Sequence, residues 1–248
     1  MTVTSWPSGG SLVLLRHGQS TANAAGLFTG ILDPALSPSG ADEALAAAGL
    51  LTAHDLVPDA VLVSPLQRAV QTAAIVAGEL ELPAGTVDTD WRLNERNYGA
   101  LTGRSKDDVR AEAGEAQFLA WRRSVDTAPP AMSDERLAVF ADTALFRGLP
   151  PRALTRTESL RDVMTRVAEI HTERVLPLLA EKRTVLVVAH GNSLRAYCAV
   201  LEGLDKSAIH RLNLPTGHPL VYQAGGRRYL DAPRAEAAAL ALALDGGT

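Results

Sequence analysis

Residues 11–23 read SLVLLRHGQSTAN, an apolar run that ends in an arginine, a histidine and a glycine. Residues 12–15 within it are apolar on both faces, which is typical of a strand covered on both sides of a sheet. Two further runs, AVLV at 60–63 and TVLVVA at 184–189, have the same composition. The sequence therefore predicts three buried strands, the first of which leads directly into polar side chains.

Helical patterns separate these strands. In residues 155–170, Leu160, Val163, Met164 and Val167 recur at helical spacing and define one apolar face. Helix starts are predicted at Ser37 with Pro38, at Ser64 with Pro65, and at a capping box of Thr155 and Glu158. Strands that alternate with helices indicate an α/β fold, and we expect a three-layer α/β/α arrangement around a mainly parallel central sheet.

Each of the three strands ends in polar residues. In an open parallel sheet, ligands bind beyond the carboxyl ends of the strands, so these residues are expected to converge on one crevice. Arginine forks match phosphate oxygens, and phosphate is the common small ligand that needs several of them. The segments concerned are Arg16-His17-Gly18, Ser64-Pro65 with Arg68 one turn later, and His190-Gly191-Asn192-Ser193.

The composition is that of a globular protein, with 248 residues, 46% hydrophobic residues and a net charge of −4. Because no run of Lys or Arg is present, we expect neither nucleic acid nor a membrane as a partner. The apolar stretches are far shorter than the roughly 20 residues that span a bilayer, so we expect a soluble protein. A lone cysteine, Cys198, suits a reducing compartment such as the cytoplasm and is expected to be a buried small side chain.

We expect a single domain over residues 1–248. Residues 1–10 lack the features of a secretory signal and are expected to form a loose leader. Residues 124–157 hold four prolines and little periodicity, which predicts a long excursion over the carboxyl edge of the sheet. The alanine- and leucine-rich segment at 231–248 is expected to be a mobile tail that contains a helix.

Several blocks of the chain resemble the histidine phosphatase superfamily and, within it, the cofactor-dependent phosphoglycerate mutases. RHG marks only the superfamily, whereas LNERNYG, GRSK and WRRS point to the mutase branch. The similar blocks are LVLLRHGQS with Asn23, FTG at 28–30, LSPSG at 36–40, VSPLQRAVQTA at 63–73, WRLNERNYGALTGRSK at 91–106, WRRS at 121–124, TESLRD at 157–162, VVAHGNSLRA at 187–196 and LNLPTGHPLVY at 212–222.

The resemblance implies roles for individual residues. His17 would be the nucleophile that becomes phosphohistidine, with His190 opposite and Glu95 as general acid and base. Arg16 and Arg68 would clamp the transferring phosphoryl group. The implied substrate-binding residues are Asn23, Thr29, Gly30, Tyr98, Lys106, Arg122, Arg123, Gly191 and Asn192.

The chemistry of these residue types agrees with the implied roles. A phosphoryl group in transfer needs positioning and compensation of its negative charge, and a neutral imidazole between arginines suits that task. Neighbouring cations should lower the pKa of His17 below its ordinary value of about 6.5. Arg122 and Arg123 are adjacent on a predicted helix and point in different directions, so both reach one ligand only if the helix ends at the site.

The chain departs from the family pattern in two places. Gln19 and Ala22 replace an acidic and an aromatic residue of the usual motif, and residues 128–149 match the family's proline-rich segment poorly. The remaining histidines, at 54, 171, 210 and 218, lack the spacing of metal ligands and are expected to be structural or exposed. No metal is implied by the sequence.

The resemblance implies a phosphoglycerate mutase of glycolysis and gluconeogenesis that interconverts 3-phosphoglycerate and 2-phosphoglycerate. It further implies 2,3-bisphosphoglycerate as the priming cofactor, a small-molecule phosphoglycerate substrate, and a homodimer or homotetramer. Two alternatives stay open. One is a histidine phosphatase that hydrolyses small phosphomonoesters, and the other is an inactive domain that binds phosphorylated ligands.

Overall fold

A computed structural model describes residues 6–244 and 246–247. In this part of the chain, six strands form one sheet in the order β3-β2-β4-β1-β5-β6. The sheet is parallel from β3 to β1, while β5 pairs antiparallel with both β1 and β6. The three predicted strands are confirmed. The strands are β1 (Ser11–Arg16), β2 (Ala60–Val63), β3 (Val87–Thr89), β4 (Thr184–Ala189), β5 (Leu220–Gln223) and β6 (Gly226–Tyr229).

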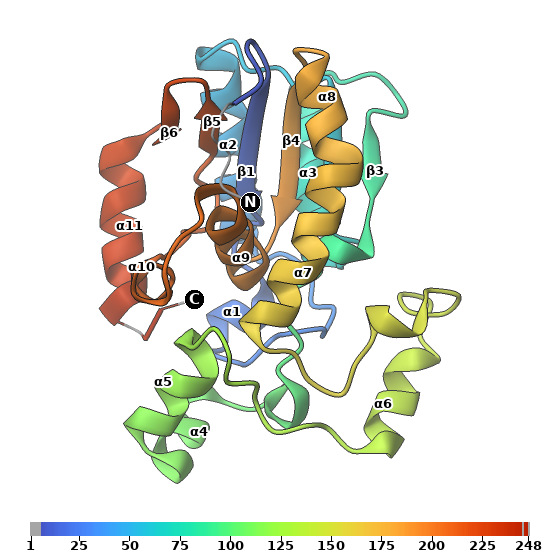
Figure 1. Ribbon diagram of the computed structural model, residues 1–248, viewed down its shortest axis with the longest axis vertical. Coiled ribbons are helices and arrows are strands. Elements are labelled where there is room, and N and C mark those ends of the chain that lie inside the picture. Colours follow the sequence, from blue (N-terminus) through green and yellow to red (C-terminus); the bar gives the residue numbers. More distant parts are fainter. Residues whose placement is uncertain (1–5, 245, 248) are drawn as a thin grey trace.

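Helices cover both faces of this sheet, so the predicted three-layer α/β/α fold is confirmed (Figure 1). α2 and α3 pack against one face, and α7, α8 and α9 against the other. The helices of the described residues are α1 (Thr21–Ala24), α2 (Pro38–Ala53), α3 (Gln67–Glu79), α4 (Lys106–Ala113), α5 (Glu115–Arg123), α6 (Asp134–Ala141), α7 (Leu160–Ile170), α8 (Leu176–Ala180), α9 (Gly191–Glu202), α10 (Lys206–Arg211) and α11 (Ala232–Leu244), with short turns of other helix types between them.

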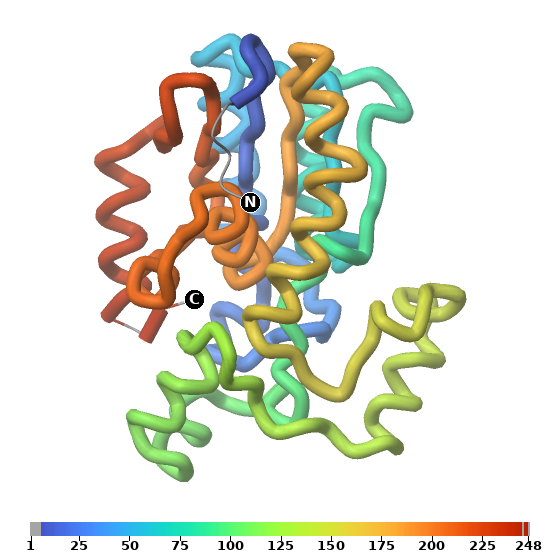
Figure 2. The backbone as a smooth tube through the Cα atoms, in the orientation of Figure 1, coloured from blue at the N-terminus to red at the C-terminus, as the bar shows by residue number. Residues whose placement is uncertain are grey.

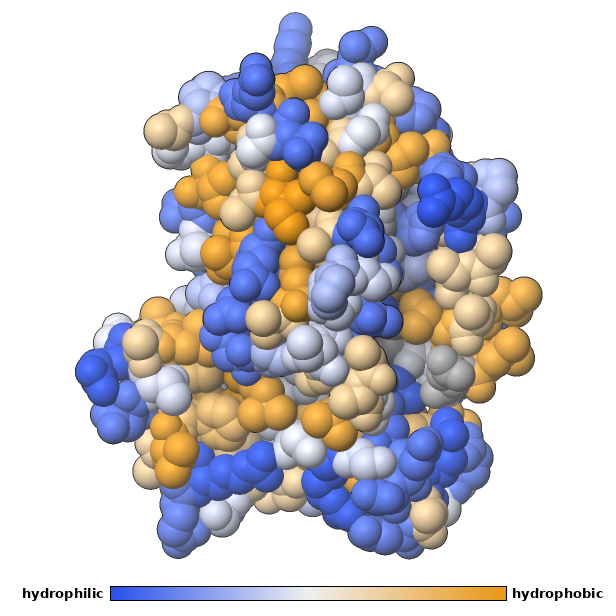
Figure 3. All heavy atoms as spheres, turned by 180° about the vertical axis from the view of Figure 1, so that it is seen from behind, coloured by the Kyte–Doolittle hydropathy of each residue, from blue (hydrophilic) through white to orange (hydrophobic). Residues whose placement is uncertain are grey.

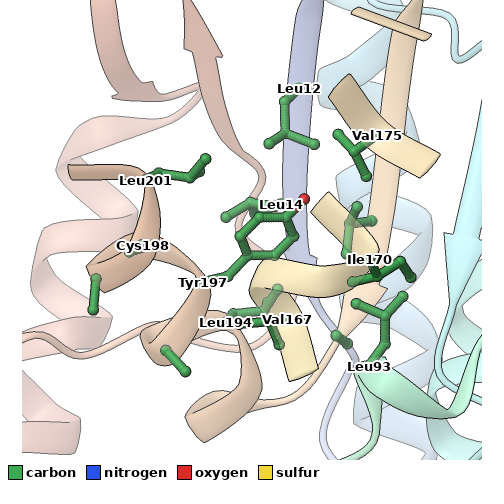
Figure 4. Close-up of a cluster of buried hydrophobic side chains, with 14 of the residues drawn as sticks. Leu12, Leu14, Leu93, Val167, Ile170, Val175, Leu194, Tyr197, Cys198 and Leu201 are labelled. Carbon is green, nitrogen blue, oxygen red and sulfur yellow. The ribbon is translucent and has the colours of Figure 1, made fainter. Parts of the chain in front are cut away.

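The alternation of side chains along β1 divides the core between the two faces. Leu12 and Leu14 pack with residues of α7 and α9, including Ile170 and Tyr197 (Figure 4). The intervening Val13 and Leu15 pack against α2 and α3. Figure 3 shows the outer surface on the α2 and α3 side, where apolar side chains gather over the upper part. Because both faces of the strand are covered, its near-continuous apolar run follows directly from its place in the sheet.

The register of β1 and β4 sets the position of the polar strand ends. Arg16 lies opposite Ala189, and the backbone N–H of His17 donates to the Ala189 carbonyl at 3.0 Å. The next residue of each strand is therefore a histidine, His17 on one and His190 on the other. Two parallel strands in this register deliver both imidazoles to the same edge.

Two predicted helix starts are wrong. α3 begins at Gln67 after Leu66, and no side chain caps it. The Ser64 hydroxyl bonds to His190, Asn94 and the Leu66 N–H, and to no N–H inside the helix. α7 begins at Leu160, where Ser159 and not Thr155 is the cap of a capping box with Asp162. The start predicted at Ser37 with Pro38 is confirmed.

Glu158, the other member of the capping box predicted for α7, has a different partner. Its carboxylate accepts from the Arg166 guanidinium at 2.9 and 3.1 Å. Along the apolar face predicted for α7, Leu160, Val163 and Val167 are buried and Met164 is partly buried. The helix face was thus predictable, whereas the cap predicted at Thr155 was not formed, since Ser159 caps the helix and Glu158 pairs with Arg166.

Residues 124–157 lie beyond the carboxyl ends of the strands together with α4 and α5 (Figure 2). The segment is not wholly irregular, because it contains α6 and a 3-10 turn at Pro151–Ala153. Met132 and Phe146 form a small apolar cluster with Ile31, which anchors the segment. No helix of the described residues is long and apolar enough to cross a bilayer.

The two ends of the described chain are packed differently. The Trp6 ring stacks on Tyr222 with ring centroids 5.9 Å apart, so the described part of the expected leader rests on β5. The helix expected near the end of the chain is confirmed as α11. Residues 1–5, 245 and 248, which belong to the expected leader and tail, lie outside the described residues. Mobility of residues 231–248 stays a prediction.

Candidate functional site

His17 and His190 lie side by side at the carboxyl edge of the sheet. Their ring centroids are 4.8 Å apart in an edge-to-face arrangement, and both side chains are buried. The Arg68 Nε–H donates to His17 Nε2 at 3.2 Å, while His17 Nδ1 lies 2.6 Å from the Gly18 carbonyl. Because a guanidinium only donates and a carbonyl only accepts, His17 carries its proton on Nδ1. Nε2 is therefore unprotonated, and its lone pair, which accepts from Arg68 in this structure, is the one that can act as a nucleophile.

The electrostatic environment keeps both imidazoles neutral. Burial lowers the pKa of His17 well below 6.5, and the charges of Arg68 and Arg16 lower it further. Burial also lowers the pKa of His190, with contributions from Arg68 and from His17. The lowering expected for His17 is present, although burial contributes more to it than the neighbouring cations do.

The arginines beside His17 are held by backbone carbonyls. The Arg68 guanidinium donates to the carbonyls of Leu32 at 2.7 Å and Gly30 at 3.0 Å, and Arg16 donates to the Leu214 carbonyl at 2.8 Å. Arg68 is fully buried. These acceptors are neutral, and the described carboxylates that act on the two guanidinium groups, Glu95 among them, do not form ion pairs with them in this structure, so both side chains are suited to an anionic ligand.

Glu95 lies at the amino end of α9. Its carboxylate accepts from the backbone N–H of Arg96 at 2.7 Å and from that of Asn192 at 3.2 and 3.3 Å. Asn192 is the second residue of α9, after Gly191, and a helix N-terminus favours a negative charge. The Asn192 side-chain amide donates to the Tyr98 hydroxyl at 2.9 Å. Asn192 directly, and Tyr98 through Asn192, are thus connected by hydrogen bonds to Glu95, the predicted general acid and base.

One cavity brings most of the predicted residues together, with a volume of about 60 Å³. Lys106 from α4 and Arg122 from α5 add two further cations to its wall. Near the end of the chain, Leu242 and Gly247 also line it, and the Gly247 carbonyl accepts from the Arg122 guanidinium. The predicted residues on its wall are Arg16, His17, Asn23, Thr29, Gly30, Arg68, Glu95, Tyr98, Lys106, Arg122 and Asn192.

Three predicted residues do not line this cavity. His190 lies behind His17, and Gly191 begins α9. Arg123 points away from Arg122, and its guanidinium donates to the carbonyls of His210 and Leu212 beside a second cavity of about 430 Å³. The divergence of the adjacent arginines follows from their positions at the end of α5, because neighbouring residues on a helix face different directions.

Ser64 and Arg96 belong to the site and were not among the predicted site residues. The Ser64 hydroxyl lies 2.8 Å from His190 Nε2. The Arg96 guanidinium lies 4.6 Å from the centre of the Tyr98 ring and donates to the Trp121 and Arg122 carbonyls. Ser64 follows a predicted strand, as the site histidines do, and that position was the signal available in the sequence. Arg96 has no comparable signal beyond its place next to Glu95.

The other four histidines do not join the site. His171 is buried and its Nδ1 lies 2.9 Å from the Tyr197 hydroxyl, whereas His54 and His210 are exposed and His218 is half-buried. Cys198 is buried, as expected for a small core side chain. Over residues 6–244 and 246–247, no group of three or more His, Cys, Asp or Glu side chains is arranged to hold a metal ion.

The fold and the paired histidines define a class of protein, and a family model agrees with it. The model of the histidine phosphatase superfamily, branch 1, matches residues 12–229. The chain therefore belongs to the histidine phosphatase superfamily.

Curated relatives within this superfamily carry a more specific name. A protein of Thermobifida fusca is 45% identical over 236 residues, which cover 92% of this chain and 96% of the relative. A protein of Nitratidesulfovibrio vulgaris is 44% identical over 243 residues, which cover 95% of this chain and 98% of the relative. Both are named 2,3-bisphosphoglycerate-dependent phosphoglycerate mutase.

Solved structures with the same fold include phosphatases. A mycobacterial glucosyl-3-phosphoglycerate phosphatase in complex with VO3 is 28% identical, with a TM-score of 0.67, and the match covers 89% of this chain and 96% of that one. The alpha-ribazole phosphatase of Shigella flexneri is 26% identical, with a TM-score of 0.59 and coverage of 85% and 89%.

Proposed function

We propose that this chain is a 2,3-bisphosphoglycerate-dependent phosphoglycerate mutase, which interconverts 3-phosphoglycerate and 2-phosphoglycerate. The curated relatives at 40–45% identity support this function. The observation that carries it is the charge of the cavity, where a neutral His17 shares the wall with Glu95 and an excess of cations. The described cationic residues on that wall are Arg16, Arg68, Lys106 and Arg122.

The residues present fit the substrate and the cofactor, because both are small polyanions. A phosphoglycerate carries a phosphate and a carboxylate, and two groups of cations on one cavity wall can hold the two ends. Arg16 and Arg68 would hold the transferring phosphoryl group, and Lys106 and Arg122 the other anionic group. Bound 2,3-bisphosphoglycerate would supply the phosphoryl group that primes His17.

We propose that His17 Nε2 attacks phosphorus and forms a phosphohistidine as the bond to the ester oxygen breaks. The two arginines compensate the charge that spreads over the phosphoryl oxygens. Glu95 gives a proton to the departing oxygen and takes one from the attacking hydroxyl when the group returns, a role typically worth about 10² to 10⁴ in rate. In this proposal Asn23, Thr29, Gly30, Tyr98, Gly191 and Asn192 contact the glycerate or the phosphoryl oxygens. Arg123, which lies beside the second cavity, acts indirectly by holding the end of α5 that carries Arg122.

A second candidate function is hydrolysis, in which water attacks the phosphohistidine. The likeness to solved phosphatase structures favours it, with TM-scores of 0.67 and 0.59. A mutase must keep water away from its intermediate. Leu242 and Gly247, near the end of the chain, border the cavity, and this cover supports transfer over hydrolysis.

The purified protein should be assayed with 3-phosphoglycerate, with and without a catalytic amount of 2,3-bisphosphoglycerate. Formation of 2-phosphoglycerate that depends on the bisphosphate supports the mutase. Release of inorganic phosphate at a comparable rate supports the phosphatase. If neither product forms, the inactive binding domain is the remaining alternative.

Variants of the two central residues test the roles. The His17→Ala variant should lose acid-labile phosphorylation entirely, because it lacks the imidazole that would carry the phosphoryl group. The Glu95→Gln variant should be labelled but transfer about 10² to 10⁴ times more slowly, since it lacks the proton shuttle. Acid-labile label that persists in His17→Ala would refute the assignment of the nucleophile.

We further propose that the protein acts in the cytoplasm in glycolysis and gluconeogenesis, as a homodimer or homotetramer. Exposed apolar side chains, such as Leu45 of α2 and Val70 of α3, support self-association. Light scattering coupled to gel filtration would test it, and a monomer at micromolar concentration would contradict it.

A further inference from the structure

Ser64 is buried behind the nucleophile, where its hydroxyl oxygen has two side-chain partners and accepts from the Leu66 backbone N–H at 3.3 Å. It follows β2 directly and is fully buried, as is His190. Its hydroxyl oxygen lies 2.8 Å from His190 Nε2 and 2.8 Å from Asn94 Oδ1. Asn94 is itself buried and follows the 3-10 turn Trp91–Leu93. Three segments far apart in the sequence thus meet in one chain of hydrogen bonds.

The chemistry of the partners sets the direction of this chain. Asn94 Oδ1 is an acceptor, so the single hydroxyl hydrogen of Ser64 is used in the bond to it. The Ser64 oxygen must then accept, and the hydrogen in its second bond comes from His190 Nε2. A neutral imidazole carries one N–H, so His190 Nδ1 holds a lone pair.

His190 Nδ1 is buried and has no hydrogen-bond partner among the described residues. Buried polar atoms are normally paired, and the ring of His190 lies against that of His17, which does line the cavity, so its unpaired nitrogen is suited to a group bound at His17. The neighbouring His17 is the proposed point of attachment of the phosphoryl group. A phosphoryl oxygen is therefore the partner that this nitrogen fits.

We propose that Ser64, supported by Asn94, is a positioning residue that holds His190 through Nε2 and presents Nδ1 to the phosphoryl group. This inference rests on the proposed function and deepens it. Donation from Nδ1 to a phosphoryl oxygen requires one proton, taken up from solvent when the oxyanion binds. Ser64 acts through His190 and does not itself touch the reacting atoms.

The charges around His190 explain why the proton arrives only with the anion. Arg68 of α3, Arg16 of β1 and Arg166 of α7 face the ring together with His17, and these cations oppose its protonation. A phosphoryl group with two negative charges offsets them. Protonation of His190 and binding of the oxyanion are thus coupled, and each favours the other.

Nitrogen NMR of the full-length protein labelled at its histidines tests the proposal without any assay of turnover. In phosphate-free buffer at pH 7, His190 should show a protonated Nε2 and a bare Nδ1. Saturating inorganic phosphate should protonate Nδ1 as well. A resting state with the proton on Nδ1, or a ring that phosphate leaves unchanged, would overturn the proposal even if mutase activity were found.

Variants connect this spectroscopic state to catalysis. Ser64→Ala should lose the single tautomer and lower kcat about tenfold, which corresponds to one hydrogen bond of ordinary strength, with KM little changed. Ser64→Thr keeps the hydroxyl and should restore both. The matched control is Ser159→Ala, which removes another buried serine hydroxyl, the cap of α7, and should leave the tautomer and kcat unaltered.

The two parts of the argument can fail separately. If 2-phosphoglycerate does not form but phosphate is released, the tautomer and its response to phosphate should still be observed. If Ser64→Ala does not fold, the spectra of the unaltered protein decide. Full kcat in a folded Ser64→Ala variant would show that His190 needs no such support.

Discussion

Two contacts and its burial prepare the side chain of His17 to act as a nucleophile. The Gly18 carbonyl accepts from Nδ1–H, Arg68 contacts Nε2, and burial removes water from the ring. The first contact orients the ring, while the other two disfavour protonation. The result is a nucleophile that needs no separate base to activate it.

This arrangement predicts an acid limb of activity at unusually low pH. Because the pKa of His17 is lowered well below 6.5, the neutral and reactive form persists as pH falls through 6.5. If protonation of His17 causes the acid limb, kcat/KM should stay constant from pH 7.5 to pH 6. Arg68→Gln, which removes a cation beside the ring, should move the limb upward. Loss of half the activity by pH 6.5 in the unaltered protein would contradict the prediction.

Stability should depend on pH through a different histidine. Burial lowers the pKa of His171 to about 4, against about 6.5 in the unfolded chain. Between these values the unfolded state binds more protons, so the stabilising contribution is complete above pH 6.5 and is lost as pH falls toward 4. The loss is at most about 3 kcal/mol. Urea unfolding at pH 7 and pH 5 would measure it, and His171→Gln, which cannot titrate, should show a smaller difference.

At the scale of elements, the start of α2 presses on the loop that carries His17. Neither Gly18 nor Gly40 has room for a Cβ, since an added carbon at either position would overlap backbone of the other segment. α2 begins with Pro38 and is capped by Ser37, whose hydroxyl also reaches the Gln19 carbonyl at 3.1 Å. The helix thus sets the path of the chain just after the nucleophile.

A pair of glycines in α2 tests this contact. Gly40→Ala should displace the loop and lower kcat about a hundredfold, because small misplacements of a reacting group are costly. Gly49→Ala, on the exposed side of the same helix with nothing within 4 Å of the added carbon, should stabilise the protein by about 0.5 to 1 kcal/mol with unchanged activity. Equal activity in the two variants would show that the contact does not position His17.

The strands and helices around the sheet differed in how far sequence could predict them. β1, β2 and β4 are buried on both faces, and this leaves a local apolar signature. The edge strands β3 and β6 are largely exposed and lack it. The cap at Ser64 was predicted wrongly because a serine before a helix and a serine that binds a distant histidine have the same local pattern. Only the fold brings His190 to it.

In the candidate site, too, local sequence predicted the residues but not the contacts that depend on distant segments. Most of the predicted residues lie in short blocks at strand and helix ends, and eleven of them line one cavity. The separation of Arg122 from Arg123 was foreseeable from helix geometry, although its direction was not. Leu242 and Gly247 carried no local signal, since their place on the wall depends on how α11 packs against the rest of the molecule.

For the whole molecule, the charge of the cavity has a consequence for stability. Arg68 is buried and Arg16 is half-buried, and the backbone acceptors named for them above are uncharged carbonyls. Burial lowers the pKa of Arg68 to about 10, which reflects the cost of a desolvated cation. An anion that binds there relieves this cost in the folded state alone.

Phosphate should therefore raise the melting temperature. At a concentration 100 times its dissociation constant, a ligand of the folded state contributes about 2.7 kcal/mol, or a rise of about 5 °C or more for a chain of this size. Scanning calorimetry in phosphate and in chloride of equal ionic strength would measure the difference. Arg68→Gln should abolish most of it, and an equal rise in chloride would point to nonspecific screening.

The contact between Gly247 and Arg122 means that the chain offers its own acceptor to a cation proposed for the substrate. Such an internal competitor is tethered, so its effective concentration does not fall when the protein is diluted. The apparent dissociation constant then equals the intrinsic value divided by the fraction of molecules in which that contact is broken. Affinity for phosphoglycerate would thus be tuned by changes in the last turns of the chain, far from the reacting atoms.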